Sequence, residues 1–214
     1  MQLSEIQAIF WDFDGVIADS VDVKTRAFET MFAPWGETIL GQVIDHHRLH
    51  GGISRVEKID HSFRHFIGQP LTPAELAAKC AVYSDLVKQQ VIQAPLIPGA
   101  EAALAFLFEK VPQFVISGTP EDELREITRQ RHLDRYFRRV LGSPVHKTTH
   151  VSNLLSEFHL DPARCVFVGD ALTDLESAEK TGTRFIGIQG MITFPETTIV
   201  LPDCTGIIEA LQAL

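Results

Sequence analysis

Short apolar runs and longer amphipathic stretches alternate along most of the chain. The apolar runs are rich in β-branched and aromatic residues and are bounded by polar or turn residues, which is typical of buried strands. Six runs fit this description: Ile6–Phe13, Gln113–Ser117, Arg139–Leu141, Arg164–Val168, Arg184–Ile188 and Thr198–Leu201. Helical spacing predicts helices over Ala100–Lys110, Glu121–His132, Thr149–Phe158, Ala171–Thr181 and Thr205–Leu214. This alternation predicts an α/β fold, with a parallel sheet covered by helices on both faces.

One segment departs from this alternation. From Val21 to Gln93 the apolar residues follow helical spacing, and no convincing strand interrupts them. The pair Thr72 and Pro73 is typical of the first residues of a helix. Residues 21–93 are therefore predicted to form a helical insertion that follows the first strand.

The composition indicates a folded protein that binds neither nucleic acid nor membranes. With 214 residues, of which 45% are hydrophobic, the chain is long enough for one large domain with a smaller insertion. Its net charge of −9 disfavours non-specific binding to nucleic acid or anionic membranes, and it implies that an anionic substrate needs a local cation. No apolar run approaches the roughly 20 residues that span a bilayer.

Cysteine usage and the N-terminal sequence favour the cytoplasm. Cys80, Cys165 and Cys204 show no CxxC or other metal-type spacing, which is typical of a reduced intracellular compartment. The first apolar run has no basic segment before it, so no signal peptide is expected. We therefore expect a cytoplasmic protein that is a monomer or a homodimer.

Two carboxylates stand at the end of the first apolar run. Asp12 and Asp14 are one residue apart, so their side chains share one face of a strand. Ligands of parallel α/β sheets bind beyond the carboxyl ends of the strands, where this pair is placed. Because two close carboxylates repel each other, a hard cation such as Mg²⁺ would stabilise them, and Gly15 would let the backbone turn tightly beside it. The alternative is that both are ordinary acids at the start of the following helix.

Other predicted strands also end in polar residues. Ser117 and Gly118 follow the second run, and their hydroxyl and backbone N–H groups suit either an anion or a plain helix cap. Asp170 and Asp174 follow the fourth run, and they either face the same crevice or serve the first turn of a helix. Lys147 follows the third run. A lysine is usually a solvated surface charge, but in a crevice lined by aspartates it would supply the missing cation.

Taken in order, these motifs resemble those of the haloacid dehalogenase superfamily of phosphohydrolases. The stretch DFDGV matches the first motif, ISGT the second, Lys147 the third and GDALTD the fourth. The resemblance implies a Rossmann-like catalytic core formed by residues 1–20 and 94–214.

The insertion resembles the small helical cap of the phosphoglycolate phosphatase and β-phosphoglucomutase branch of that family. On this basis residues 21–93 are expected to form a cap domain that closes over the site. The two crossings between core and cap, Ile17–Asp22 and Ala94–Gly99, are the candidate hinges.

The resemblance assigns the chemistry to the two acids of the first motif. Asp12 would attack phosphorus and form an aspartyl-phosphate. An ordinary aspartate, with a pKa of about 3.9, is ionised at neutral pH, so Asp12 is expected to need no base. Asp14 would protonate the leaving alcohol and then deprotonate the hydrolytic water, which requires a pKa raised by burial and neighbouring charges. Dehalogenase and phosphonatase relatives lack an acid at that position, so Asp14 favours a phosphate ester as substrate.

The resemblance also implies a cofactor, Mg²⁺, and a set of phosphate-binding groups. Asp12, the backbone carbonyl of Asp14 and Asp170 would hold Mg²⁺, with Asp174 close by. The phosphoryl oxygens would be held by Ser117, the N–H of Gly118, and Lys147.

The cap segment carries a glycine pair followed by basic residues. Gly51 and Gly52 interrupt the helical pattern and are expected to form a loop that faces the core. Since relatives contact the leaving group with a similarly placed loop, Ser54 and Arg55 are expected to bind substrate, with Lys58 nearby. The alternative is that Arg55 and Lys58 are solvated.

Five histidines gather in the same segment. His46 and His50, and likewise His61 and His65, have the i, i+4 spacing that can hold a metal ion on one face of a helix. The segment lacks the glutamate of an HExxH site, and the acidic crevice already accounts for a metal. We therefore predict surface histidines.

These inferences predict a Mg²⁺-dependent phosphatase that hydrolyses a small phosphate monoester through an aspartyl-phosphate. Two alternatives stay open. One is a sugar-phosphate mutase of the β-phosphoglucomutase type, which would use the same two acids. The other is a phosphate-binding regulator without catalytic activity. The sequence does not identify the substrate.

Overall fold

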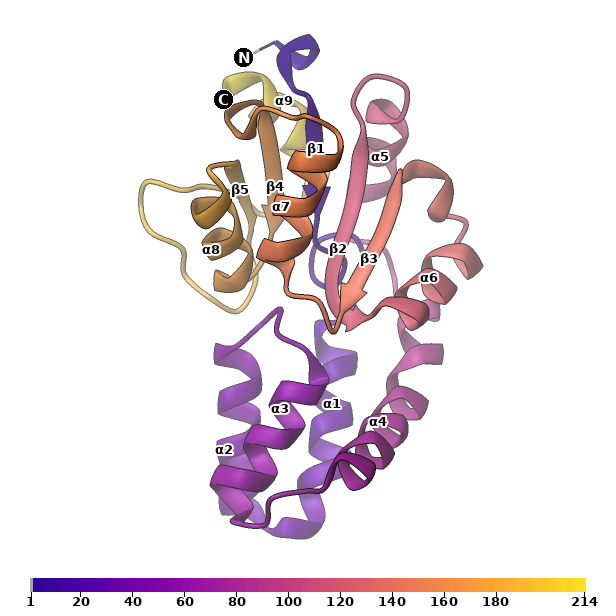
Figure 1. Cartoon of the computed structure of the whole chain (residues 1–214), viewed down its shortest axis with the longest axis vertical. Coiled ribbons are helices and arrows are strands. Elements are labelled where there is room, and N and C mark those ends of the chain that lie inside the picture. Colours follow the sequence, from indigo (N-terminus) through magenta and orange to yellow (C-terminus); the bar gives the residue numbers. More distant parts are fainter. Residues whose placement is uncertain (1) are drawn as a thin grey trace.

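The computed structural model describes residues 2–214, and its centre is a six-stranded parallel sheet within that range (Figure 1). The strands run in the order β3-β2-β1-β4-β5-β6. Their bounds are Ala8–Trp11 for β1, Gln113–Pro120 for β2, Arg139–Ser143 for β3, Cys165–Gly169 for β4, Arg184–Ile188 for β5 and Ile199–Leu201 for β6. The first strand therefore lies at the centre of the sheet, paired with β2 on one side and β4 on the other.

The two faces of β1 are both buried, which explains its continuous apolar sequence. Ala8 and Phe10 point to one face and pack with α7 (Lys147–Glu157) and α8 (Leu172–Thr181). Ile9 and Trp11 point to the opposite face, which is covered by three helices: α5 (Ala100–Leu107), α6 (Glu121–Gln130) and α9 (Ile207–Ala213). The predicted fold class, a parallel α/β sheet with helices on both faces, is confirmed.

Helices fill the segment between β1 and α5, from residue 21 to residue 93. They are α1 (Val21–Phe32), α2 (Glu37–Leu49), α3 (Arg55–His61), a π-helical turn (Ser62–Ile67) and α4 (Pro73–Gln93). Thr72 and Glu75 form a capping box at the start of α4. Figure 1 shows these helices beyond the end of the sheet toward which β3 points, with both chain termini at the far end. We refer to residues 21–93 as the helical cap.

The two crossings between sheet and cap lie side by side. The N–H of Asp19 donates to the carbonyl of Pro95 at 2.9 Å, and the N–H of Ile97 donates to the carbonyl of Ile17 at 3.0 Å. The second crossing ends at Gly99, which has a φ of +80°, and a Cβ there would lie 2.5 Å from the backbone nitrogen of Thr205. Glycine is needed at this position because a side chain would collide with backbone atoms.

Across residues 2–214, no helix combines the length and the apolar character that crossing a membrane requires.

Candidate active site

Three carboxylates converge where the neighbouring strands β1 and β4 end. Asp12 follows β1, Asp170 follows β4, and Asp174 lies in the first turn of α8. One oxygen of each carboxylate lies within 4.8 Å of the others. The backbone of Gly15 passes so close that a Cβ there would lie 2.1 Å from Oδ2 of Asp170. The sequence predicted this convergence, and the chemistry of the donors suits a hard divalent cation such as Mg²⁺.

Lys147 lies within this cluster, at the first position of α7. Its Nζ lies 2.9 Å from Oδ2 of Asp12 and 2.6 Å from Oδ1 of Asp174. Only 6% of the residue is exposed. Burial disfavours the ammonium form, but the carboxylates of Asp12 and Asp174 outweigh this and raise the pKa of Lys147. The charged form of Lys147 is therefore favoured, and its ammonium lies among the aspartates of the crevice.

The charge state of Asp12 differs from the sequence-based expectation. Burial raises the pKa of Asp12, and although Lys147 opposes this, the carboxylates of Asp174 and Asp14 add to the rise. The pKa of Asp170 is also raised, first by burial and then by Asp12. The assumption that Asp12 titrates as an ordinary aspartate is therefore wrong for the protein without a bound cation. A cation between the carboxylates would lower both pKa values and favour the ionised form of Asp12.

Asp14 lies in a different set of contacts. Its carboxylate is paired with the ammonium of Lys24 on α1. It also accepts hydrogen bonds from the hydroxyls of Ser20 at 2.6 Å, Thr119 at 3.2 Å and Ser117 at 3.3 Å. Lys24 donates in turn to Oγ1 of Thr119 at 2.8 Å. The carboxylate is thus fixed by groups from both the cap and β2.

These contacts overturn the expectation of a raised pKa at Asp14. Burial alone would raise the pKa, but the charge of Lys24 and the hydrogen bonds from Lys24, Ser20 and Thr119 lower it below its ordinary value. Sequence reasoning missed Lys24. The available signal was its place in the first turn of the helix that follows the first motif, because that turn has to face the strand ends.

The cap loop rests on the core, as the glycine pair predicts. Oγ1 of Thr173 donates to the carbonyl of Gly51 at 2.9 Å. A Cβ on Gly118 would lie 2.5 Å from the carbonyl oxygen of Gly52, and a Cβ on Gly52 would lie 3.3 Å from Nζ of Lys147. The loop therefore approaches the end of β2 through backbone atoms, which leaves little room for side chains.

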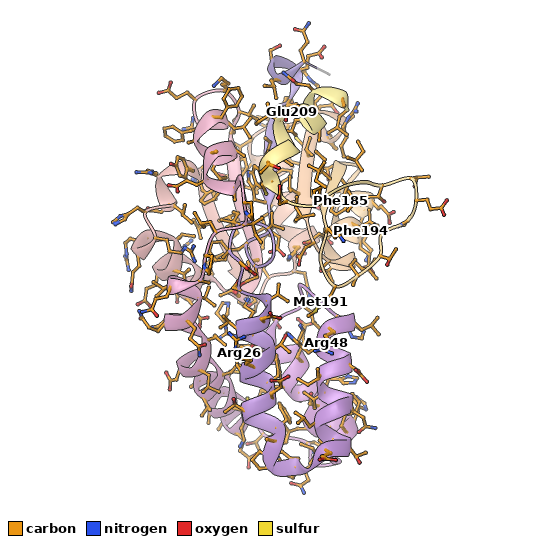
Figure 2. The ribbon with its side chains drawn as sticks, turned by 180° about the vertical axis from the view of Figure 1, so that it is seen from behind. Arg26, Arg48, Phe185, Met191, Phe194 and Glu209 are labelled. Atoms are coloured by element: carbon orange, nitrogen blue, oxygen red, sulfur yellow. The ribbon has the colours of Figure 1, made fainter. Side chains whose placement is uncertain are left out.

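A cavity lies between the strand ends and the cap. Figure 2 shows Met191, on the loop after β5, close to the end of α2 that carries Arg48, and both residues line the cavity. Its polar lining includes Asp12, Asp14, Lys24, His47, Arg48, Arg55, Lys58, Ser117, Thr119 and Asp170. Its apolar lining includes Val21, Phe28, Ile53, Ala171, Met191 and Ile192.

The two cap residues predicted to bind substrate have other partners. Arg55 makes a bidentate ion pair with Glu123 of α6, at 2.8 and 2.6 Å, and lies over the ring of Tyr83. Ser54 is the N-cap of α3, bonded to Glu57, and it does not line the cavity. The expected substrate contact of Ser54 is therefore replaced by a capping interaction, because an N-cap hydroxyl must face its own helix. Glu123 and Tyr83 lie 68 and 28 residues from Arg55, and no local pattern signals these contacts.

The cap lysine and one cap histidine are buried. Lys58 and Arg55 are each 5% exposed, so the alternative that they are solvated is wrong. His47 is 7% exposed and bonds to Lys58, so the prediction of surface histidines is wrong for this residue.

The four remaining cap histidines discussed above form a row of neighbouring rings. The ring centroids lie 4.2 Å apart for His46 and His50, 4.1 Å for His46 and His61, and 4.5 Å for His61 and His65. His65 is exposed and the other three are half-buried. We compared the row with groups of three or more His, Cys, Asp or Glu side chains whose ligand atoms all lie within 4.8 Å of one another. Within residues 2–214 the aspartate cluster is such a group, and the histidine row is not.

Residues 6–182 match the family model described as haloacid dehalogenase-like hydrolase. The chain is 27% identical to phosphoglycolate phosphatase 1 of Pseudomonas aeruginosa over 82% of this chain and 66% of that protein, slightly less than two thirds of its length. It is 25% identical to 6-phosphogluconate phosphatase of Escherichia coli over 84% of this chain and 81% of that protein.

Solved structures share the whole fold. The CbbY protein of Rhodobacter sphaeroides, crystallised with phosphate, has a TM-score of 0.76 at 22% identity, covering 98% of this chain and 100% of that one. A protein described as a predicted phosphoglycolate phosphatase from Haemophilus somnus has a TM-score of 0.75 at 17% identity, covering 97% and 99%. At these identities the likeness concerns the fold, and it extends over cap and core together.

Glu123→Gln should lower the free energy of unfolding by about 3 kcal/mol, because it leaves the buried charge of Arg55 without its partner. Glu126→Gln is the matched control. It lies on the same helix and also pairs with a cap cation, Lys88, but the two side chains of that pair are 39% and 34% exposed. Its loss should stay below about 1 kcal/mol. Urea unfolding followed by circular dichroism measures both, and equal losses would show that the Arg55 pair contributes no more than a surface ion pair.

Proposed function

The chain belongs to the haloacid dehalogenase-like hydrolases, and we propose that it hydrolyses a small phosphate monoester with Mg²⁺ as cofactor, through a phosphoryl group carried by Asp12. It is a phosphoric monoester hydrolase by its family match and its named phosphatase relatives. One observation carries the proposal. Asp12 stands at the end of the central strand between Lys147, Asp170 and Asp174, with Asp14 on the same stretch facing the cavity.

The first proposed step transfers the phosphoryl group to the protein. An oxygen of Asp12 attacks phosphorus, the bond from phosphorus to the ester oxygen breaks, and Asp14 gives a proton to the departing oxygen. Asp14 must hold a proton to do this, and its ion pair with Lys24 opposes that state. We therefore include in the proposal that the incoming ester displaces Lys24 from Asp14 and accepts the hydrogen bonds that the ammonium of Lys24 donates.

The second proposed step returns the phosphoryl group to water. Asp14 takes a proton from the water as the water oxygen attacks phosphorus, and the bond between phosphorus and Asp12 breaks to release inorganic phosphate. Lys147, the hydroxyl of Ser117 and the N–H of Gly118 are proposed to hold the phosphoryl oxygens in both steps. Lys147 already contacts Asp12, so its position suits that role.

The carboxylate cluster fits Mg²⁺. We propose that Asp12, Asp170 and the backbone carbonyl of Asp14 hold the ion, with Asp174 supporting the site through Lys147. When bound, Mg²⁺ would supply the positive charge that offsets repulsion among the carboxylates and the phosphoryl oxygens.

The substrate is proposed to be small. The cap loop lies directly on the end of β2, so the leaving group must fit between Phe28, Ile53 and Met191 on the cavity wall. Two relatives are named for phosphoglycolate and 6-phosphogluconate, both phosphate esters of hydroxy acids. Esters of this kind are the first candidates.

A phosphatase fits the cavity better than a mutase. A mutase has to hold a second phosphate while its aspartyl-phosphate is kept from water. Arg55, the strongest candidate for that grip, is bound on both sides of its guanidinium by Glu123. Arg55 could therefore take up a second phosphate only by giving up its ion pair with Glu123.

Asp12→Asn should fold normally and lose activity by several orders of magnitude, because an amide is neither anionic nor a competent nucleophile. Asp19→Asn is the control, since Asp19 is an exposed acid on the same stretch, and it should keep near-normal turnover. Phosphate release measures both variants. Near-normal turnover by Asp12→Asn would refute the proposed nucleophile.

Removal of metal should abolish activity, and Mg²⁺ should restore it. Mg²⁺ should also raise the melting temperature of the wild-type protein, because it binds the folded state and relieves the repulsion among buried carboxylates. Asp170→Asn should require at least about tenfold more Mg²⁺ for either effect. Full activity in metal-free buffer, or a melting temperature that does not respond to Mg²⁺, would contradict the assignment.

Incubation with a bisphosphorylated sugar and a hexose phosphate distinguishes phosphatase activity from mutase activity. A phosphatase releases inorganic phosphate in proportion to the substrate consumed, and we expect that outcome. Phosphate release and the isomer ratio of the hexose phosphate can be followed in one sample by phosphorus NMR. Isomerised sugar phosphate with little inorganic phosphate would show that the protein is a mutase.

A further inference from the structure

Lys58 is a buried cation that lines the cavity and has no acidic partner. Its residue is 5% exposed. Among the described residues, its ammonium makes two hydrogen bonds, to Nδ1 of His47 at 3.0 Å and to the carbonyl of His47 at 3.2 Å. An ammonium has three donors, so one N–H is left without a hydrogen bond. A buried charge without a counter-ion is costly, and a bound anion would offset that cost.

His47 fixes the position of this ammonium through both of its ring nitrogens. Its Nε2 lies 3.2 Å from Oγ1 of Thr25, and that hydroxyl donates to the carbonyl of Val21 at 3.0 Å. The hydroxyl therefore accepts from Nε2–H, which leaves Nδ1 unprotonated to accept from Lys58. Burial and the charge of Lys58 lower the pKa of His47 far below its usual value, which agrees with a neutral ring. The ring of Phe28, 4.7 Å away, packs against the imidazole.

The other buried or half-buried cations at this cavity are occupied. Lys24 is paired with Asp14, and Arg55 is paired with Glu123. Lys147, beneath the cavity, is paired with Asp12. Burial, with Lys24 nearby, lowers the pKa of Lys58 to about 7, and an anion beside the amine would raise it again. Among the described residues that line the cavity, Lys58 is thus the buried cation of the cap that a ligand can reach without breaking an ion pair, whereas Arg48, which also lines the cavity, is exposed to solvent.

We propose that Lys58 selects esters whose leaving group carries a carboxylate, and that His47 and Thr25 are positioning residues for its ammonium. One positive charge and one available N–H match a carboxylate better than a phosphate dianion, which carries more charge and more acceptor oxygens. The inference rests on the proposed function for the placement of the phosphoryl end at Asp12. It adds which property of the leaving group is recognised, and by which residue.

Binding to the Asp12→Asn variant tests the selection without turnover. Phosphoglycolate and ethyl phosphate have similar size and differ by a carboxylate in place of a methyl group. Calorimetry should show phosphoglycolate bound at least tenfold more tightly. In Asp12→Asn/Lys58→Met the ratio of the two affinities should fall to within threefold of one. Equal affinities before the Lys58 change, binding of neither ester, or a ratio that survives the change overturns the proposal.

A bisphosphate decides between the two kinds of anion. Ethylene glycol bisphosphate carries a phosphorylated hydroxymethyl group in place of the carboxylate. It should depend on Lys58 less than phosphoglycolate does, and a greater dependence would overturn the choice of a carboxylate. Since these measurements need no hydrolysis, a wild-type protein that bound phosphoglycolate through Lys58 but released no phosphate would refute the proposed function and leave this inference standing.

Variants of the positioning residues separate positioning from folding. His47→Phe removes the acceptor for Lys58, whereas His47→Asn can keep a carbonyl oxygen near the place of Nδ1. When combined with Asp12→Asn, His47→Phe should lose most of the preference for phosphoglycolate over ethyl phosphate. His47→Asn should keep at least a third of that preference. Thr25→Val removes the acceptor for Nε2–H with little change in shape, and it should lower the preference about threefold. Thermal unfolding checks the fold of each variant. An unchanged preference in both His47→Phe and Thr25→Val overturns the positioning role.

Discussion

Repulsion among carboxylates at the ends of β1 and β4 is the constraint from which the rest of the site follows. Two charges about 5 Å apart at an effective dielectric constant of about 20 repel by roughly 3 kcal/mol. Asp12, Asp170 and Asp174 lie at or within that separation. Lys147 offsets part of the repulsion, and burial together with the remaining repulsion raises the pKa values of Asp12 and Asp170. The same imbalance that favours protonated carboxylates in the ion-free cluster would also favour the binding of a divalent cation.

Basic side chains of the cap pair with acidic side chains of the core. In the described part of the chain, three ion pairs join a cation of the cap to an acid of the core: Lys24–Asp14, Arg55–Glu123 and Lys88–Glu126. Each pair holds the cap against the sheet. The proposed phosphate ester is itself an anion, so it would compete with core carboxylates for the same cations. Packing of the cap on the core and binding of the proposed substrate would therefore draw on one set of charges.

The sequence carried the fold and the acidic centre but not the contacts between cap and core. Local patterns were sufficient for β1, whose buried faces require an apolar run, and for Asp12 and Asp170, because adjacent parallel strands must end together. The pKa of Asp14 was predicted in the wrong direction because its partner, Lys24, comes from another unit of the structure. His47 was predicted at the surface, since burial of an imidazole depends on the lysine and threonine that happen to face it. Such partners are set by tertiary packing, which periodicity does not report.

The paired crossings between sheet and cap affect how the inserted segment can change during evolution. The hydrogen bonds that tie Ile17 to Ile97 and Asp19 to Pro95 bring the start and end of the inserted segment to one place. The inserted segment therefore leaves the core and returns to it at nearly the same point, so the core does not have to open to accommodate it. The entropic cost of closing such a loop grows only slowly with its length. A shorter, longer or unrelated segment could be accommodated at the same two points with Asp12 and Asp170 still at the ends of β1 and β4, but Asp14 would lose its ion pair with Lys24. Exchange of the inserted segment would therefore change the residues that face the proposed leaving group, while Asp12, Lys147 and Asp170 stay on the core.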